Sequence, residues 1–149
     1  MATNNETAKR AYAIYHVGLK VLLKKGDEFL FLTDTVGKHF DLPGGRIDDA
    51  EHTIPLTEVI AREVSEELGE EIEYKLGKPA FQFRRHFRSK GLSTFLTVYE
   101  AEYLSGEIRL SIEHSDFQWI NPRKIDLKEE QFFHKEEYLA FKKYFENLV

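Results

Sequence analysis

The chain has 149 residues, about the size of one domain, and 42% of them are hydrophobic, including 12 Phe and 7 Tyr. This composition can fill a core, which excludes global disorder. With 21 Lys and Arg against 26 Asp and Glu, the net charge is −5. Such a surface has no general attraction to nucleic acid or anionic membranes.

The absence of Cys excludes disulfides, thiol nucleophiles and zinc–thiolate sites, and it fits the reducing cytoplasm. We expect neither a secretory signal nor a membrane span, because no segment has the required apolar length. Residues 1–9 are expected to form a flexible polar tail, and residues 10–149 a single domain.

The first half of the chain predicts a hairpin followed by a sharp turn. Aromatic and β-branched residues predict strands at residues 12–24 and 28–33, joined by a turn at Lys25-Gly26-Asp27. Pro43-Gly44-Gly45 is a strong break, and the acidic segment 46–55 is expected to be irregular.

An amphipathic helix is predicted to follow. It is expected to begin near Pro55, where a missing N–H costs nothing, and to end at Gly69. Apolar residues repeat every four positions and form one stripe. The stripe consists of Leu56, Ile60, Val64 and Leu68.

Three carboxylates lie on this helix beside the apolar stripe. Glu63, Glu66 and Glu67 have the spacing i, i+3 and i+4, at which like charges repel and weaken a helix. Mg²⁺ prefers carboxylate oxygens and leaves room for water and substrate phosphates. The cluster therefore favours a metal-dependent phosphate enzyme, and the alternative is a solvated acidic helix face.

The second half of the chain predicts more strands and a covering helix. Strands are expected at residues 71–76, 80–88, 92–103, 107–110 and 117–120. Asn121-Pro122 has the form of a helix cap with a first-turn proline, and a last helix is predicted over residues 130–148. Strands, helix, strands and helix in this order predict an α+β layered domain.

A basic cluster occupies the predicted strand at residues 80–88. Alternation puts Arg85 on the same face as Phe83, and Arg84, His86 and Arg88 on the other face. Arg84 and Arg85 are candidate substrate contacts, because arginine forks match phosphate oxygens. The alternative is salt bridges to the acidic surface.

Several aromatic residues are candidates for stacking on a base. Phe40 is one, with Tyr15 and Tyr99, although aromatic residues in strands more often belong to a core. The aromatic last helix is expected to cover the sheet, and apolar surface left over on it would support a homodimer.

Residues 45–69 resemble the Nudix box of the Nudix hydrolases. That pattern is Gly, five residues, Glu, seven residues, Arg-Glu, an aliphatic residue, any residue, Glu-Glu, any residue, Gly and an aliphatic residue. Gly45 and Glu51 keep the first spacing, and residues 62–69, Arg-Glu-Val-Ser-Glu-Glu-Leu-Gly, keep the second block. Two positions depart from it: ten residues, 52–61, replace seven, and Glu70 replaces the last aliphatic residue.

The flanking segments strengthen the resemblance, which covers roughly residues 12–145. Residues 40–45, Phe-Asp-Leu-Pro-Gly-Gly, look like the segment that precedes the box, and Glu113-His114 with residues 117–120 looks like a later segment of the family. The resemblance implies a Nudix-like α/β/α sandwich with a mixed, curved sheet between helices.

The resemblance also implies a pyrophosphohydrolase that cleaves a nucleoside diphosphate linked to another group. Mg²⁺ or Mn²⁺ would be held by Glu63, Glu66 and Glu67, with Gly45 at the same site. Arg62 would hold a carboxylate in place, and Glu113 would be a further ligand or the general base. The longer loop makes Glu51 the least secure member of the box. His114 is expected to be structural, since Mg²⁺ prefers oxygen.

Three functions remain open within this resemblance. A nucleoside diphosphate sugar leads narrowly over an oxidised nucleoside triphosphate as the substrate, and this lead rests on the breadth of that substrate class and not on a residue. The Pro or Tyr that marks subgroups acting on ADP-ribose or dinucleoside polyphosphates, some sixteen residues after the box, is not evident. Capped RNA is disfavoured by the acidic charge. The alternative to an enzyme is a catalytically silent Nudix-fold module that binds a nucleotide, which the retained carboxylates argue against.

Overall fold

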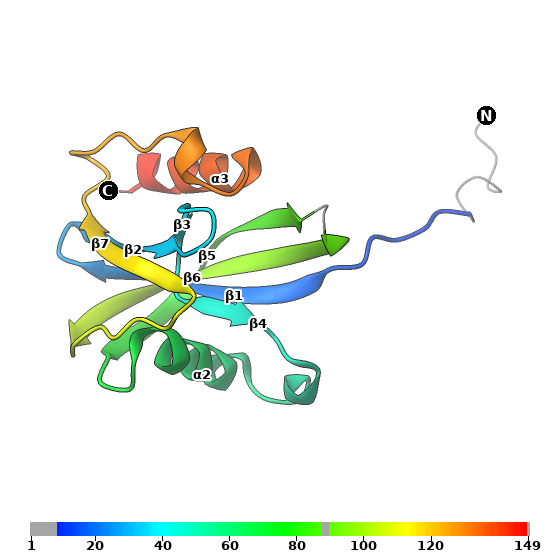
Figure 1. The fold of residues 1–149 in the computed structure, drawn as a ribbon, viewed down its shortest axis with the longest axis horizontal. Coiled ribbons are helices and arrows are strands. Elements are labelled where there is room, and N and C mark those ends of the chain that lie inside the picture. Colours follow the sequence, from blue (N-terminus) through cyan, green and yellow to red (C-terminus); the bar gives the residue numbers. More distant parts are fainter. Residues whose placement is uncertain (1–8, 88–89, 149) are drawn as a thin grey trace.

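The computed structural model describes residues 9–87 and 90–148. A mixed sheet of seven strands forms the middle layer, with one long helix on each face (Figure 1). The strand order is β3-β2-β1-β6-β5, β4 also pairs with β1, and β7 pairs with β2. The β1–β6 pair is parallel, and the other pairs are antiparallel. The expected α+β Nudix-like sandwich is confirmed.

The elements follow one another along the chain as a hairpin, two very short strands, a helix, a second hairpin, a strand and a helix. The strands are β1 His16–Lys25, β2 Glu28–Asp34, β3 Phe40–Asp41, β4 Gly44–Arg46, β5 Glu73–Phe87, β6 Leu92–Ser105 and β7 His114–Ile120. The helices are α2 Leu56–Leu68 and α3 Lys135–Glu146, with 3-10 turns η1 Asp49–Glu51 and η3 Glu129–Gln131.

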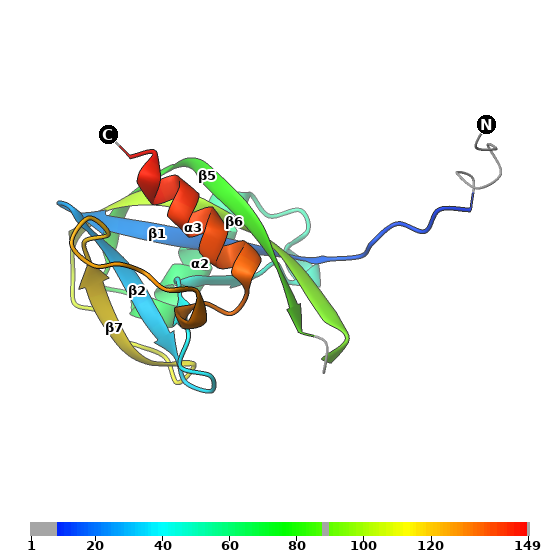
Figure 2. The same ribbon diagram turned by 90° about the horizontal axis from the view of Figure 1, so that it is seen from above.

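Two hydrophobic cores lie on the two faces of the sheet. The core under α2 is mostly aliphatic and includes Val21 and Val64, whereas the core under α3 is aromatic and centres on Phe31 and Phe141. The two helices cover opposite faces, and α3 runs diagonally across the strands (Figures 1 and 2). Because both faces are covered, residues 18–23 of β1 are buried without interruption.

Most predicted elements are confirmed, with shifted ends. The helix predicted over residues 55–69 is α2, and the long strands β2 and β6 agree with their predictions. The first strand begins only at His16, because β1 has strand partners only from that residue onward. Residues 9–15 instead extend away from the sheet (Figures 1 and 2).

Two predicted elements after α2 are wrong. Residues 107–110 form no strand, and Arg109 N donates a hydrogen bond to Leu68 O (2.8 Å) at the end of α2 instead. The strands expected at residues 71–76 and 80–88 are one strand, β5, in which the register shifts at Pro79 because proline has no N–H to donate. Arg88 lies outside the described residues, as does most of the expected tail.

The last helix is shorter than predicted, and the helix start predicted at Asn121-Pro122 is a turn. Asn121 Oδ1 accepts a hydrogen bond from Arg123 N (2.9 Å), so the side chain closes a local turn and no helix follows. The helix α3 begins at Lys135 instead of residue 130.

Replacing Phe141 by Ala is expected to destabilise the fold strongly. Its ring is almost fully buried, with ring centroids 4.9 Å from Phe81 and 5.6 Å from Phe31. A cavity there should lower the free energy of unfolding by about 3–5 kcal/mol in urea titrations. Leu139→Ala, on the exposed side of α3, is the control and should cost about 0.5 kcal/mol or less. Equal losses would show that α3 does not dock on the sheet in this way.

Candidate active site

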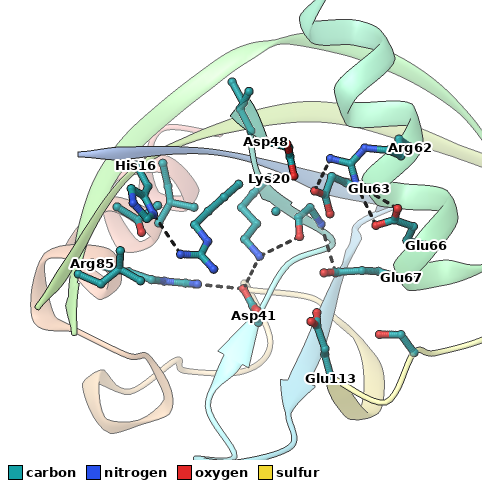
Figure 3. Close-up of a pocket in the computed structure, with 18 of the residues that line it drawn as sticks. His16, Lys20, Asp41, Asp48, Arg62, Glu63, Glu66, Glu67, Arg85 and Glu113 are labelled. Carbon is teal, nitrogen blue, oxygen red and sulfur yellow. Dashed lines mark hydrogen bonds and ion pairs between the residues drawn. The ribbon is translucent and has the colours of Figure 1, made fainter. Parts of the chain in front are cut away.

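A pocket of about 810 Å³ opens between α2, the strands β1 and β4, and the end of the β5–β6 hairpin. Glu63, Glu66 and Glu67 line the α2 side with Arg62 among them, and Lys20 and Arg85 lie opposite, around Asp41 (Figure 3). The acidic residues are Asp41, Asp48, Glu63, Glu66, Glu67 and Glu113. The basic residues are Lys20, Arg46, Arg62, Arg85 and Lys90, with His16 beside them. Carboxylates therefore predominate on the α2 side of the pocket and cations on the opposite side.

The helical period places two of the three α2 carboxylates inside the protein. Glu63 and Glu67 are four residues apart and adjoin the buried residues Val64 and Leu68, so they point along the edge of the core toward β4. Their side chains are 11% and 7% exposed, whereas that of Glu66 is 57% exposed. The predicted cluster thus consists of two buried carboxylates and one exposed carboxylate at the pocket rim.

Arg62 joins the loop before α2 to the helix. Its Nε and Nη2 atoms both contact the Glu51 carboxylate at 2.6 Å, and Nη2 also contacts Glu63 Oε1 at 2.8 Å. Its Nη1 contacts both oxygens of Glu66 at 3.0 Å. Such forked pairs fix orientation as well as distance. Hydrogen bonds from Arg62 hold the pKa of Glu51 below its ordinary value.

The ten-residue segment 52–61, of which residues 56–61 are the start of α2, leaves Glu51 beside Arg62. Asp48 Oδ1 accepts a hydrogen bond from Ala50 N, and Glu51 Oε1 accepts one from Asp48 N, both at 2.9 Å, which closes the short turn η1 as a capping box. The extra residues follow this turn. Glu51 was the least secure member of the box in the sequence, and the structure places it in direct contact with Arg62.

Two glycines let β4 approach the carboxylates of α2. A Cβ atom on Gly45 would lie 2.6 Å from Glu63 Cδ, so only a glycine leaves room for this carboxylate. Gly44 has φ +137°, which favours glycine, and its N–H donates to Glu67 Oε2 at 3.3 Å. The Gly44-Gly45 pair therefore allows the backbone of β4 to lie directly against the carboxylates of Glu63 and Glu67.

A chain of buried charges connects the pocket to α3. Asp41 Oδ1 lies 3.2 Å from Lys20 Nζ and 3.1 Å from Arg85 Nη2, and Arg85 continues to Glu137 of α3 at 2.6 Å. Asp41 Oδ2 accepts a hydrogen bond from His114 Nε2 at 3.1 Å. Burial raises the pKa of Asp41, but Lys20 and Arg85 outweigh it and hold that pKa well below its ordinary value.

The two buried α2 carboxylates are not fully compensated. Burial raises the pKa of Glu67 to about 7, although Lys20 and His114 pull it downward. Burial also raises the pKa of Glu63 against the opposing pull of Arg62. His114 Nδ1 is buried without a hydrogen-bond partner among the residues that the structure describes, and it lies 3.8 Å from Glu67 Oε2. A further cation near Glu63 and Glu67 would stabilise their charged forms and so offset the free-energy cost of burying them.

These donors suit a hard divalent cation by their chemistry. The donors are carboxylate oxygens, and the carboxylates of Glu63 and Glu67 are buried. They lie beside Gly45, where a Cβ atom would fill the space that the Glu63 carboxylate occupies. Within residues 9–87 and 90–148, however, no three His, Asp or Glu side chains converge in the arrangement of a metal site. In this arrangement Arg62 donates hydrogen bonds to both Glu63 and Glu66.

The structure separates the other candidate residues. Glu113 lines the pocket, as does Arg85, but Arg85 is engaged by Asp41 and Glu137. Arg84 does not line this pocket; it is exposed on the other face of β5 and pairs with Glu136 at 2.8 Å. Phe40 does not line it either, because its ring packs in the aromatic core, 5.0 Å from Phe31.

Sequence reasoning missed Lys20, Asp41 and Arg46. Lys20 is the one charged residue inside the buried run of β1, residues 18–23, and such a residue is rarely buried without a partner. That signal was visible in the sequence. Arg46 differs from Arg62 and Arg85, because no carboxylate of the described chain lies within ion-pair distance of it; its contact is His16 Nδ1 at 3.0 Å.

No helix in the described part of the chain is both long and apolar enough to cross a membrane. No curated protein matches the chain. Among solved structures, the MutT protein of Methanosarcina mazei Go1 shares 24% identity, with 89% of this chain and 91% of that chain covered and a TM-score of 0.67.

Two further solved structures carry names that state a substrate. A UDP-X diphosphatase is 18% identical, covering 97% of this chain and 72% of its own, with a TM-score of 0.63. An ADP-ribose pyrophosphatase from Streptococcus suis 89-1591 is 14% identical, covering 87% of this chain and 92% of its own, with a TM-score of 0.59. At these identities the similarity concerns the fold.

A family model described as NUDIX domain matches residues 14–141. This range contains the glycine pair, Arg62 and all three α2 carboxylates, so the resemblance seen at residues 45–69 is confirmed at the level of the family. The chain belongs to the Nudix family and is a Nudix hydrolase.

Proposed function

We propose that this chain is a pyrophosphohydrolase that uses Mg²⁺ or Mn²⁺ to cleave a nucleoside diphosphate linked to another group, with nucleoside diphosphate sugars as the leading candidates. The observation that carries the proposal is the division of one pocket into buried carboxylates and a basic wall. A diphosphate needs both sides, a cation at the carboxylates for its charge and arginine or lysine for its outer oxygens.

The names of two structural neighbours support a diphosphate compound as substrate, since they are a UDP-X diphosphatase and an ADP-ribose pyrophosphatase. Nudix hydrolases act on small nucleotide compounds and generally use divalent metals. A chain without Cys fits the reducing cytoplasm, where such nucleotides are abundant.

The residues of this chain would act in distinct ways. Glu63, Glu67 and Gly45 would hold the cation, with Glu66 joining them from the rim. Mg²⁺ or Mn²⁺, when bound, neutralises phosphate charge and makes water a better nucleophile. Arg62 fixes two of the carboxylates by its fork.

The remaining pocket residues orient the substrate and accept a proton. Arg46 has a guanidinium without a carboxylate partner in the described chain, so it is available to a phosphate. Glu113 lines the same pocket and is a candidate for the general base or for a further ligand.

One observation favours a second candidate, a silent nucleotide-binding module. The three α2 carboxylates do not converge as they stand, and Arg62 occupies two of them. An oxidised nucleoside triphosphate is the other alternative substrate, and it needs the same cation and the same basic wall.

A substrate panel with product identification separates these candidates. Nucleoside diphosphate sugars, ADP-ribose and oxidised nucleoside triphosphates are incubated with the protein and Mg²⁺ or Mn²⁺, and the products are resolved by chromatography. Release of a nucleoside monophosphate from a diphosphate sugar supports the leading proposal. Binding of these compounds without any hydrolysis would establish the silent module instead.

Within that panel, Glu67→Gln should lower turnover by about 100-fold or more, the usual cost of losing a catalytic or ligand group. The substitution keeps the size of the side chain and removes the charge that would hold the cation. Glu58→Gln, an exposed position in the first turn of the same helix, should leave turnover unchanged. Equal activity in the two variants would disprove the role of Glu67.

The pH dependence of stability should report on the same carboxyl group. The pKa of Glu67 is about 7 in the folded protein and roughly 4.3 when exposed. The folded state therefore retains this proton to higher pH, and stability falls as pH rises through that interval. Without metal, wild type should lose about 2 kcal/mol more than Glu67→Gln between pH 5 and pH 8.

Urea unfolding at the two pH values measures this difference. Added Mg²⁺ should then stabilise wild type more than Glu67→Gln at pH 8, because a cation that binds only the folded state raises stability. Parallel pH profiles for the two proteins would contradict the burial argument.

Gly45→Ala should displace the Glu63 carboxylate and weaken Mn²⁺ binding by about tenfold. The new Cβ would occupy the place of that carboxylate, whereas the backbone at Gly45 does not have a positive φ and tolerates Ala. Gly26→Ala, in the β1–β2 turn with open space around its Cβ, is the control for a generic loss of stability. Titration calorimetry with Mn²⁺ compares the two, and unchanged affinity in Gly45→Ala would refute the cradle.

A further inference from the structure

Two buried cations, Lys20 and Arg85, share the carboxylate of Asp41. Lys20 and Arg85 are 6% and 7% exposed, and both direct their charge at Asp41 Oδ1. Buried cations of this kind are stable only when an anion lies beside them. Arg85 has a second anionic partner, Glu137. Among the described residues, Lys20 has one carboxylate within ion-pair distance, that of Asp41.

Lys20 and Glu67 contact the same residue of β4, Lys20 through its carbonyl and Glu67 through its N–H. Lys20 Nζ donates to Gly44 O at 3.3 Å, and Gly44 N donates to Glu67 Oε2 at 3.3 Å. Lys20 also donates to Leu42 O at 3.1 Å. A lysine side chain is flexible, so Glu67 is a natural alternative partner for this ammonium if Asp41 loses its charge.

A lysine ammonium and a divalent cation would compete for Glu67, since each neutralises the same carboxylate. We propose that Asp41 is a positioning residue that holds the Lys20 ammonium away from Glu67 and so keeps Glu67 available to a divalent cation. This inference rests on the metal-dependent function proposed above. It gives Asp41 a role through Lys20 and not as a ligand.

Asp41 has a second contact, with His114. Its Oδ2 atom accepts the hydrogen bond from His114 Nε2, which leaves His114 Nδ1 on the side of Glu67, at 3.8 Å. Asp41 therefore contacts both Lys20 and His114. Glu137 lies at the far end of the chain of charges, on α3, where its carboxylate accepts hydrogen bonds from Arg85.

The test measures Mn²⁺ affinity in four proteins by the electron paramagnetic resonance signal of free Mn²⁺. Asp41→Asn should weaken Mn²⁺ binding about tenfold or more, as loss of a supporting carboxylate does. Adding Lys20→Met to it should restore affinity to within about threefold of Lys20→Met alone. The rescue is specific, because a merely structural loss would grow when a second buried charge is removed.

Glu137→Gln is the matched control for disturbing this network. It removes a buried carboxylate from the same chain of charges but leaves Asp41 facing Lys20. Its thermal stability should fall while its Mn²⁺ affinity stays within about threefold of wild type.

The outcomes separate this inference from the proposed function. If wild type binds no Mn²⁺, both are overturned. If wild type binds Mn²⁺ but Asp41→Asn binds it equally well, or if Lys20→Met does not restore binding, only the role of Asp41 is overturned. Should Asp41→Asn alone fail to fold, the Lys20→Met background decides: a tenfold loss on adding Asp41→Asn there refutes the proposal.

Discussion

The burial of two carboxylates at the edge of α2 is the constraint on which the rest of the site depends. Glu63 and Glu67 are withdrawn from water beside an aliphatic core, and burial raises the pKa of both. An isolated buried carboxylate is costly. Arg62 and the N–H of Gly44 offset part of this cost. A cation beside Glu63 and Glu67 would offset the part of this cost that remains.

The same constraint explains why the site is connected to the far face of the sheet. A cation placed near Glu67 without an anion of its own would neutralise Glu67 directly. Asp41 supplies that anion for Lys20, and Arg85 carries the network through the protein to Glu137 on α3. The docking of α3 on its aromatic core and the arrangement of charges at the pocket are thus parts of one structure.

Local sequence patterns predicted the parts of the site that depend on helical period. Arg62, Glu63, Glu66 and Glu67 lie within six residues of one helix, so their spacing alone placed them together. Phe40 and Arg84 do not line the pocket, because their surroundings depend on residues distant in the chain: Phe132 packs on the Phe40 ring, and Glu136 of α3 binds Arg84. The strand predicted at residues 107–110 failed for a related reason, since a strand needs a partner and this segment caps α2 instead.

The arginines of the pocket divide into those that build it and one that is available to a substrate. Arg62 and Arg85 are saturated by carboxylates, whereas Arg46 extends from β4 with His16 as its contact. Phe87, Lys90 and Leu92, at the end of the β5–β6 hairpin, line the same pocket. This hairpin lies outside the Nudix box at residues 45–69. The box does not specify the side chains of this wall, so the box indicates the chemistry and leaves the substrate open.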